Sequence, residues 1–204
     1  MIRLCGVVPG LIGLIALFAV PPAAAQGLGV KGGVTLSNIV VKPSDVFGED
    51  GYSADVGGLG GVYLTFREGG RFSIEIGAQA ALRRVSFGGG DSVSIKDSLT
   101  YLEVPAVVRY PVIRIRGARI AAIGGGSFNI LLAAKESFLG DSYDTRDSFK
   151  AYEAALVVGA LAELGRKLTI DVRYLLGSDP FSVDIDFITA RQQGWQFSVG
   201  YRLR

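Results

Sequence analysis

Charged side chains recur at alternate positions along the sequence, and their types could carry chemistry. Glu75, Glu103 and Asp171 follow this pattern, as do Arg109 and Arg173, each between two apolar residues. Carboxylates held together in a dry interior can perform general acid–base catalysis when their surroundings drive their pKa values apart. The candidate positions are Lys31, Arg67, Glu75, Arg83, Glu103, Arg109, Glu153, Glu163, Lys167, Asp171, Arg173 and Arg202.

This set of residues contains both signs of charge in similar number, which favours a structural role. A charge that leaves water must be paired with an opposite charge and hydrogen-bonded. We therefore interpret the set as a network of ion pairs that fills the interior of the protein, and not as a catalytic dyad.

The sequence lacks the residues on which most hydrolytic sites depend. It contains no histidine, which removes the usual base of serine and cysteine nucleophiles and a common zinc ligand. Ser127 lies in "GGGS", outside a Gly-x-Ser-x-Gly motif. The glycine runs at 57–61, 88–90 and 124–126 lack the spacing of nucleotide-binding loops. We predict no catalytic residue, no cofactor and no enzymatic activity.

Two acidic segments raise the alternative of a Ca²⁺ site. "DSYDTRDS" contains Asp141, Asp144 and Asp147, and "SDPFSVDIDF" contains three further aspartates. Their spacing differs from that of a recognised calcium loop. We predict solvated surface loops here and no metal site.

Residues 1–25 have the three parts of an export signal. Arg3 supplies an early positive charge, residues 7–20 form an apolar core, and "PPAAAQ" provides small residues for cleavage. We predict a signal peptide over 1–25, cut after Ala25, and a single domain over 26–204. Cys5 leaves with the signal, so the mature chain has no cysteine for a disulfide or a thiol site.

The elements that position the charges alternate between two unlike faces. The last stretch, "WQFSVGYRLR", places Trp195, Phe197, Val199, Tyr201 and Leu203 on one face, with polar, charged or very small residues between them. A period of two indicates a β-strand with one apolar face. Comparable stretches begin near positions 28, 62, 72, 102, 120, 152 and 168, which makes eight strands.

The connections between these strands alternate in length. "REGG", "PVIRIRG" and "GRK" are short, whereas the other four links are long. Together with the export signal, this alternation predicts an all-β fold, an eight-stranded antiparallel up-and-down transmembrane β-barrel. The apolar faces would contact lipid, and the last strand would close on the first. Pro105 cannot donate to a ladder, so we expect a bulge or local distortion there.

An exported soluble barrel of lipocalin type is the alternative fold. Its apolar faces would point inward around a ligand, and the sparse charges would have to keep the outside soluble. The many Gly and Ala residues between those charges would solvate such a surface poorly.

The segment "TYLEVPAVVRY", residues 100–110, resembles the fourth strand of the PorT-like outer-membrane β-barrel family, in which a similar Tyr-Leu-Glu-aliphatic-Pro segment occurs. Further similar stretches follow in the family's order: "GVKGGVTLSNIV", "RIAAIGGGSFNILLAA", "LTIDVRYLLG" and "GWQFSVGYRLR". The resemblance covers nearly the whole mature chain and implies an eight-stranded barrel in the outer membrane of a Gram-negative bacterium, without shared catalytic residues. Such barrels commonly end on an aromatic residue that the assembly machinery recognises, whereas here Leu203 precedes Arg204, so Phe197 and Tyr201 would have to serve.

We expect a monomeric integral outer-membrane protein with a closed lumen filled by side chains. It would act through long extracellular loops in binding or adhesion, or as an accessory component of an envelope machine. Its partners would be outer-membrane lipid, the barrel-assembly machinery and an extracellular or envelope protein. With 21 Lys and Arg against 19 Asp and Glu, the sequence gives no basis for a nucleic-acid partner. A narrow channel for small solutes is the functional alternative, beside the soluble ligand-binding barrel.

Overall fold

The computed structural model of the chain describes residues 27–42, 52–68, 72–87, 95–138, 141–181 and 189–203. Its strands are β1 (Gly27–Lys42), β2 (Tyr52–Glu68), β3 (Phe72–Phe87), β4 (Ile95–Ile115), β5 (Ala118–Phe138), β6 (Asp141–Asp144), β7 (Tyr152–Leu164), β8 (Leu168–Gly177) and β9 (Thr189–Arg202), and a short 3-10 helix, η3, spans Arg146–Ser148. Within these segments, no helix is long and apolar enough to cross a membrane. The predicted signal peptide over 1–25 lies outside the described residues.

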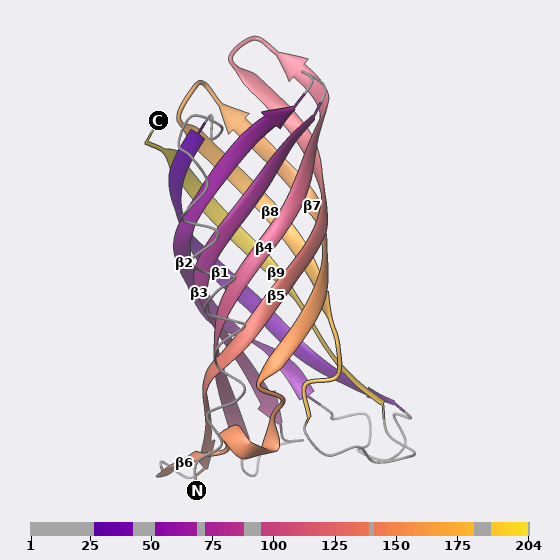
Figure 1. The fold of residues 1–204 in the computed structure, drawn as a ribbon. Coiled ribbons are helices and arrows are strands. Elements are labelled where there is room, and N and C mark those ends of the chain that lie inside the picture. Colours follow the sequence, from indigo (N-terminus) through magenta and orange to yellow (C-terminus); the bar gives the residue numbers. More distant parts are fainter. Residues whose placement is uncertain are drawn as a thin grey trace, which may run out of the picture.

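Eight of the strands form a closed antiparallel barrel (Figure 1). Each pairs with its neighbours along the chain, and β6 is a short extra ribbon beside the end of β5. Closure comes from β1 and β9, which pair from Gly29 opposite Arg202 to Lys42 opposite Thr189. This pairing removes the two open edges that a flat sheet would have. The predicted eight-stranded up-and-down barrel is confirmed.

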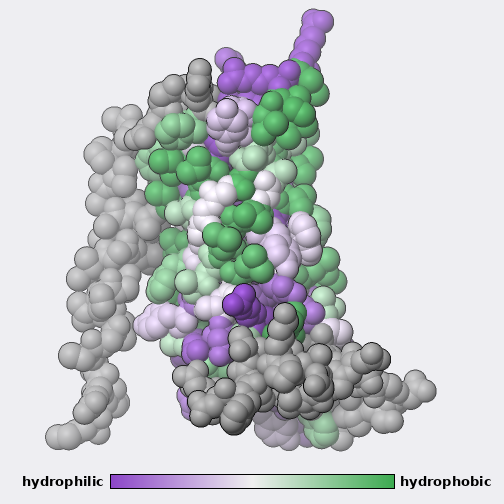
Figure 2. All heavy atoms as spheres, turned by 90° about the vertical axis from the view of Figure 1, so that its right-hand side faces the viewer, coloured by the Kyte–Doolittle hydropathy of each residue, from purple (hydrophilic) through white to green (hydrophobic). Residues whose placement is uncertain are grey.

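The two faces of the barrel wall differ as the alternation of the sequence predicts. Leu156, Ile170 and Val199 point outward and are 56%, 43% and 53% exposed, whereas the charged residues between apolar neighbours are buried inside. Hydrophobic side chains accordingly gather around the middle of the outer surface (Figure 2). A bilayer favours this arrangement. The soluble lipocalin-type alternative is wrong, because it requires the apolar faces to point inward.

The β4–β5 hairpin is longer than predicted. Residues 111–117 were expected to form a link, but β4 continues to Ile115 and β5 begins at Ala118, so that only Arg116 and Gly117 form the turn. Gly117 has a φ of 85°, which suits glycine at a tight hairpin turn. The alternation of isoleucine and arginine explains the extra strand length. The hairpin projects past the neighbouring strands at the short-turn end of the barrel (Figure 1).

Pro105 interrupts one ladder of β4 without a bulge. The pairing of β3 with β4 lacks two successive pairs, those of Gly77 with Pro105 and of Ala78 with Val104, while Pro105 still lies opposite Ser127 of β5. A Cβ atom on Gly77 would lie only 3.2 Å from the proline ring, so glycine leaves room for that ring. The register shifts between β4 and β5 lie elsewhere, next to Thr100 and Pro111. The expected distortion is therefore a gap of two pairs in the ladder and not a bulge.

Candidate functional site

Arg83 of β3 holds together one cluster of ion pairs inside the barrel. Its Nη2 lies 2.6 Å from Oε1 of Glu103 on β4, and its Nη1 lies 3.2 Å from Oε2 of Glu153 on β7. Nη1 also donates to Oε1 of Gln192 on β9 at 2.6 Å. The guanidinium carbon lies 4.7 Å from the ring centroid of Tyr101. This single buried cation therefore joins strands across the lumen through charge-assisted hydrogen bonds.

Two glutamines complete the hydrogen bonding of Glu103. Gln79 of β3 and Gln196 of β9 donate to its Oε2 at 2.6 and 2.9 Å. Gln79 also donates to Oε1 of Gln196 at 3.3 Å. The carboxylate thus accepts bonds on both oxygens, which offsets the cost of removing its charge from water.

Glu75 of β3 is the centre of a second cluster, nearer to the short turns. Its carboxylate pairs with Lys31 of β1 at 3.2 Å, with Arg173 of β8 at 2.8 Å, and with Arg109 of β4. Arg173 pairs in addition with Asp171 on its own strand at 2.8 Å. All five side chains are buried. Three basic side chains thus meet two carboxylates at this level of the lumen, and Arg109 pairs also with Glu163.

Glu163 of β7 is shared by three arginines at the short-turn mouth of the barrel. Its Oε1 lies 3.7 Å from Nη1 of Arg109 and 3.4 Å from Nη2 of Arg202, and its Oε2 contacts Arg119 of β5. The side chains of Arg119 and Arg202 are 28% and 25% exposed. The network therefore extends from the buried interior to solvent at this end.

These clusters contain most, but not all, of the charged residues that the sequence singled out. The prediction that Lys167 belongs to the lumen network is wrong. Its side chain is exposed at the β7–β8 turn, where its Nζ lies 5.5 Å from the ring centroid of Tyr201. The residue precedes β8, which begins at Leu168, and a turn residue does not follow the alternation of the strand. The side chain of Arg67 lies outside the described part of the structure. Arg119 was missed because the next inward residues of β5 are apolar.

One side of the inner wall is apolar, which the sequence reasoning did not anticipate. Residues from four adjacent strands form this buried cluster: Val107 of β4, Ala121 and Ile123 of β5, Val157 and Leu161 of β7, and Leu175 of β8. Because these side chains face inward, they occupy space beside the ionic clusters. The interior is thus a mixed apolar and ionic core, as expected for so narrow a barrel.

Two phenylalanines beyond the barrel strands cover the interior at the loop end, and we call them the apolar plug. Phe149, which follows η3, stacks on Phe181 with 5.5 Å between ring centroids, and the two form an isolated β-bridge. Phe149 packs against Leu99 and Leu131, and Phe181 packs also on the cluster that contains Val85. Val85 is the next inward residue after Arg83 on β3. The apolar plug therefore lies directly on the loop side of the Arg83 cluster.

A small cavity beside Arg83, lined by polar and apolar side chains, has room for about one water molecule. Ser37, Gln192 and Gln196 are among the residues that line it. Nε2 of Gln192 has no hydrogen-bond partner within the protein. The cavity is much too small for an organic solute.

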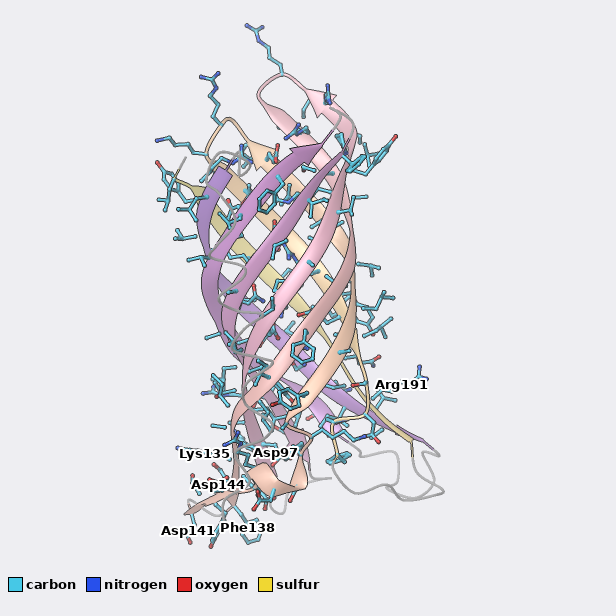
Figure 3. All side chains as sticks on the ribbon, viewed as in Figure 1. Asp97, Lys135, Phe138, Asp141, Asp144 and Arg191 are labelled. Carbon is cyan, nitrogen blue, oxygen red and sulfur yellow. The ribbon has the colours of Figure 1, made fainter. Side chains whose placement is uncertain are left out.

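Asp97 of β4 is a buried carboxylate at the loop end of the barrel, where Figure 3 shows it near Lys135 and Asp144. It is 8% exposed, its Oδ1 has no hydrogen-bond partner, and it lies opposite Glu136 of β5. Burial, together with the negative charge of Glu136, raises the pKa of the Asp97 carboxyl to about 6.

The acidic segment around β6 is largely exposed to solvent, and one of its carboxylates accepts a hydrogen bond from the backbone. Asp141 and Asp144 are exposed at the loop end (Figure 3), and Asp144 accepts a hydrogen bond from the backbone N–H of Arg146 at 3.0 Å. In the described ranges, no group of three or more acidic, His or Cys side chains is arranged to hold a metal ion. Asp184 and Asp186 of the second acidic segment lie outside those ranges.

The C-terminal strand places its predicted apolar row on the outer surface. Trp195, Phe197, Val199, Tyr201 and Leu203 are between 40% and 53% exposed. The Trp195 ring lies 4.8 Å from that of Tyr174 on β8 and 6.4 Å from that of Phe197. Aromatic rings gathered on the outside of a barrel suit the boundary between lipid and water.

The interior can pair charges, but it is poorly arranged to activate a nucleophile. The hydroxyl of Ser198 donates to Oδ1 of Asp171 at 2.8 Å, which is the geometry of a serine beside a carboxylate base. Arg173 also donates to both oxygens of Asp171, so that carboxylate is already held in an ion pair. Ser127 donates to Oδ1 of Asn129, an amide that cannot take up its proton.

A closed antiparallel barrel with apolar residues outside and ion pairs inside defines a transmembrane β-barrel protein. The chain belongs to the family described as the outer membrane protein beta-barrel domain, which it matches over residues 24–177. It is therefore an outer-membrane β-barrel protein.

Three solved structures are similar to this chain at low sequence identity. Ail, the attachment invasion locus protein of Yersinia pestis, is 17% identical with a TM-score of 0.41, and the match covers 87% of this chain and 98% of that one. Neisserial surface protein A is 11% identical with a TM-score of 0.49, covering 87% and 97%. The outer membrane protein OprG from Pseudomonas aeruginosa is 12% identical with a TM-score of 0.43, covering 89% and 97%. No curated protein matches the sequence.

Proposed function

We propose that this protein is a closed barrel in the outer membrane of a Gram-negative bacterium and acts through the loops at its long-link end. The observation that carries the proposal is the filled interior. The Arg83 and Glu75 clusters join opposite parts of the wall, and the apolar plug covers them on the loop side. With solute passage obstructed at successive levels, the loops are the part of the molecule left to meet a partner. Their role would be binding or adhesion, or that of an accessory component of an envelope machine.

The finer family assignment is also a proposal. The order of the motifs that begin with "TYLEVPAVVRY" supports a PorT-like member, exported by a signal peptide over 1–25 and recognised by the barrel-assembly machinery through its last strand. The secretion role of that family's naming member is not part of the proposal. A monomer fits a barrel in which the first and last strands already pair with each other.

A narrow channel is the second candidate, and buried polar groups without a partner in the protein favour it. Buried donors such as Nε and Nη1 of Arg109 and Nη1 of Arg173 have no hydrogen-bond partner within the protein. Water molecules on these groups would begin a polar path from the short-turn mouth. The Arg83 cluster and the apolar plug would obstruct the remainder of that path towards the loop end.

Conductance through a planar bilayer tests the closed lumen. The purified mature protein should give no steady ion conductance at neutral pH, because the paired charges hold their partners firmly in a poorly hydrated interior. Phe149→Ala and Phe181→Ala together should not open a path, since the Arg83 cluster remains. Reproducible conductance steps from the unmodified protein, with an ion selectivity changed by Glu103→Gln, would reject the closed lumen and favour the channel. If no conductance is seen, crosslinking from the loops of the protein in intact cells would identify the partner.

A further inference from the structure

The turns that join β4 to β5 and β7 to β8 are linked to each other at the short-turn end. The backbone N–H of Gly165 donates to the carbonyl of Gly117 at 2.8 Å. Arg116 and Arg166 flank these two glycines and are both exposed. The hydrogen bond therefore holds two cationic side chains next to each other on neighbouring turns.

These turns carry more positive charge than the described carboxylates around them can neutralise. Arg114 lies opposite Arg119 on the β4–β5 hairpin, and like charges placed directly opposite each other are destabilising. Arg119 is neutralised by Glu163, which Arg109 and Arg202 already share. Among the described side chains, no ion pair is formed by Arg114, Arg116, Arg166 or Lys167, and all four are exposed.

The turns that carry these cations border directly on the lipid-facing surface. The outward row of β4 continues from Tyr110 through Ile113 to Ile115, which are 56%, 48% and 60% exposed, and Ile120 lies opposite Ile113. Hydrophobic side chains accordingly reach up to the hydrophilic tip of the molecule (Figure 2). Lys167 is held toward the same outer surface, beside the ring of Tyr201. A molecule bound at this end of the barrel would therefore contact both cations and an apolar surface.

We propose that Arg116, Arg166 and Lys167, with Arg114 behind them on the inner face of the hairpin, form a basic platform that binds the phosphodiester headgroup of an anionic glycerophospholipid. The lipid would belong to the leaflet around the short-turn end, with its acyl chains against the apolar row of the hairpin. Guanidinium groups match phosphate oxygens through paired donors, and clusters of Lys and Arg beside a membrane select anionic lipids. The proposal does not depend on what the loops bind.

A lipid fits this surface better than an added peptide strand. The β4 edge beyond Arg109 has no described partner on β3, so it could in principle pair with another strand. Pro111 removes a backbone donor from that edge, and the arginines place charge along it, which are features that discourage strand addition. The platform also continues a surface that already faces lipid.

Lipid selectivity of the barrel in phosphatidylcholine vesicles tests this proposal, with spin-labelled phosphatidylglycerol and phosphatidylcholine as the probes. The mature protein should prefer the anionic probe about fivefold at low salt, and added salt should weaken the preference. In the variant with Arg114→Gln, Arg116→Gln, Arg166→Gln and Lys167→Gln, the preference should fall to near unity. Replacing the three arginines with lysine should keep most of it, because the charges remain.

A matched control removes four exposed cations from the opposite end: Arg84→Gln, Lys96→Gln, Lys135→Gln and Arg191→Gln. It makes the same change in net charge and should keep the preference. The heat-dependent gel mobility of each variant shows whether its barrel is folded. The proposal would be overturned if the unmodified protein showed no preference for the anionic probe, or if the platform variant kept that preference. An equal loss of the preference in the control variant would also overturn it.

Discussion

Replacing Arg83 with methionine should strongly destabilise the barrel. The Arg83 guanidinium donates to Glu103, Glu153 and Gln192, with side-chain exposures of 4% for the arginine and 1% for each carboxylate. Methionine replaces the apolar stem of arginine and contributes none of these hydrogen bonds. Two carboxylates would then be left in the interior without the cation that joins them.

The expected loss is about 3–5 kcal/mol of unfolding free energy, the usual cost of leaving a buried charge unpaired. Most of that cost comes from the carboxylates and not from the missing arginine. Adding Glu103→Gln and Glu153→Gln to Arg83→Met should therefore recover at least about 2 kcal/mol, since an ion cluster replaced as a whole is often nearly neutral.

Urea unfolding of the barrel in lipid vesicles measures these differences, and the protein carries its own probe. Trp195 is the single tryptophan of the sequence and lies on the outer face of β9, so its fluorescence reports loss of lipid contact. Arg84→Met is the matched control: Arg84 is exposed next to Arg83, and its replacement should change stability by less than about 0.5 kcal/mol. A loss of under about 1 kcal/mol for Arg83→Met, or no recovery in the triple variant, would refute the reasoning.

Three further predictions concern topology, lipid contact and pH. A cysteine at Asp144 should react with an impermeant thiol reagent on intact cells, whereas one at Arg166 should react only after permeabilisation; the reverse would place the long loops in the periplasm. Ile170→Arg should cost about 2–4 kcal/mol near the bilayer midplane, and Thr169→Ser, on the inner face, should cost little; equal tolerance would mean that the faces are assigned wrongly. Because the pKa of Asp97 is raised from 3.8 to about 6 in the folded state, the folded protein binds the proton more tightly, so stability should fall as pH rises from about 4 to 6. Asp97→Asn should remove that slope and stabilise the barrel by about 1–2 kcal/mol at pH 7; a variant with an unchanged slope would exclude Asp97 as its cause.

The fold could be predicted because a barrel wall has only two environments. Each residue faces either lipid or the lumen, so the period of two assigned Glu75 and Arg173 to the interior and Val199 to the outside without any knowledge of contacts. The same rule explains the failures. Lys167 lies in a turn, where alternation stops, and residues 113–116 alternate although they were taken for part of a link.

The apolar residues of the lumen and the partners of each ion pair were harder to predict than the positions of the charges. Val157 and Leu161 are flanked by residues as apolar as themselves, so nothing in their local pattern shows which face they occupy. The apolar plug depends on contacts between Phe149 and Phe181, which follow different strands and meet only in the folded barrel. The carboxylate with which each arginine pairs likewise depends on strand register and on the distance across the lumen. The alternation of the sequence predicts neither of them.

The pairing of β1 with β9 has a consequence for the order of events during folding. The residues that meet in this ladder, such as Gly29 and Arg202, are separated by nearly the whole described length of the chain. Only the two pairings of β9, with β8 and with β1, must wait for the last strand, and of these the pairing with β1 joins the more distant residues. Pairings between such distant residues are slow to form. Until β9 arrives, β1 is an open edge with an outward apolar face, so the interval before closure is when the nascent protein is most prone to aggregation and most dependent on a chaperone.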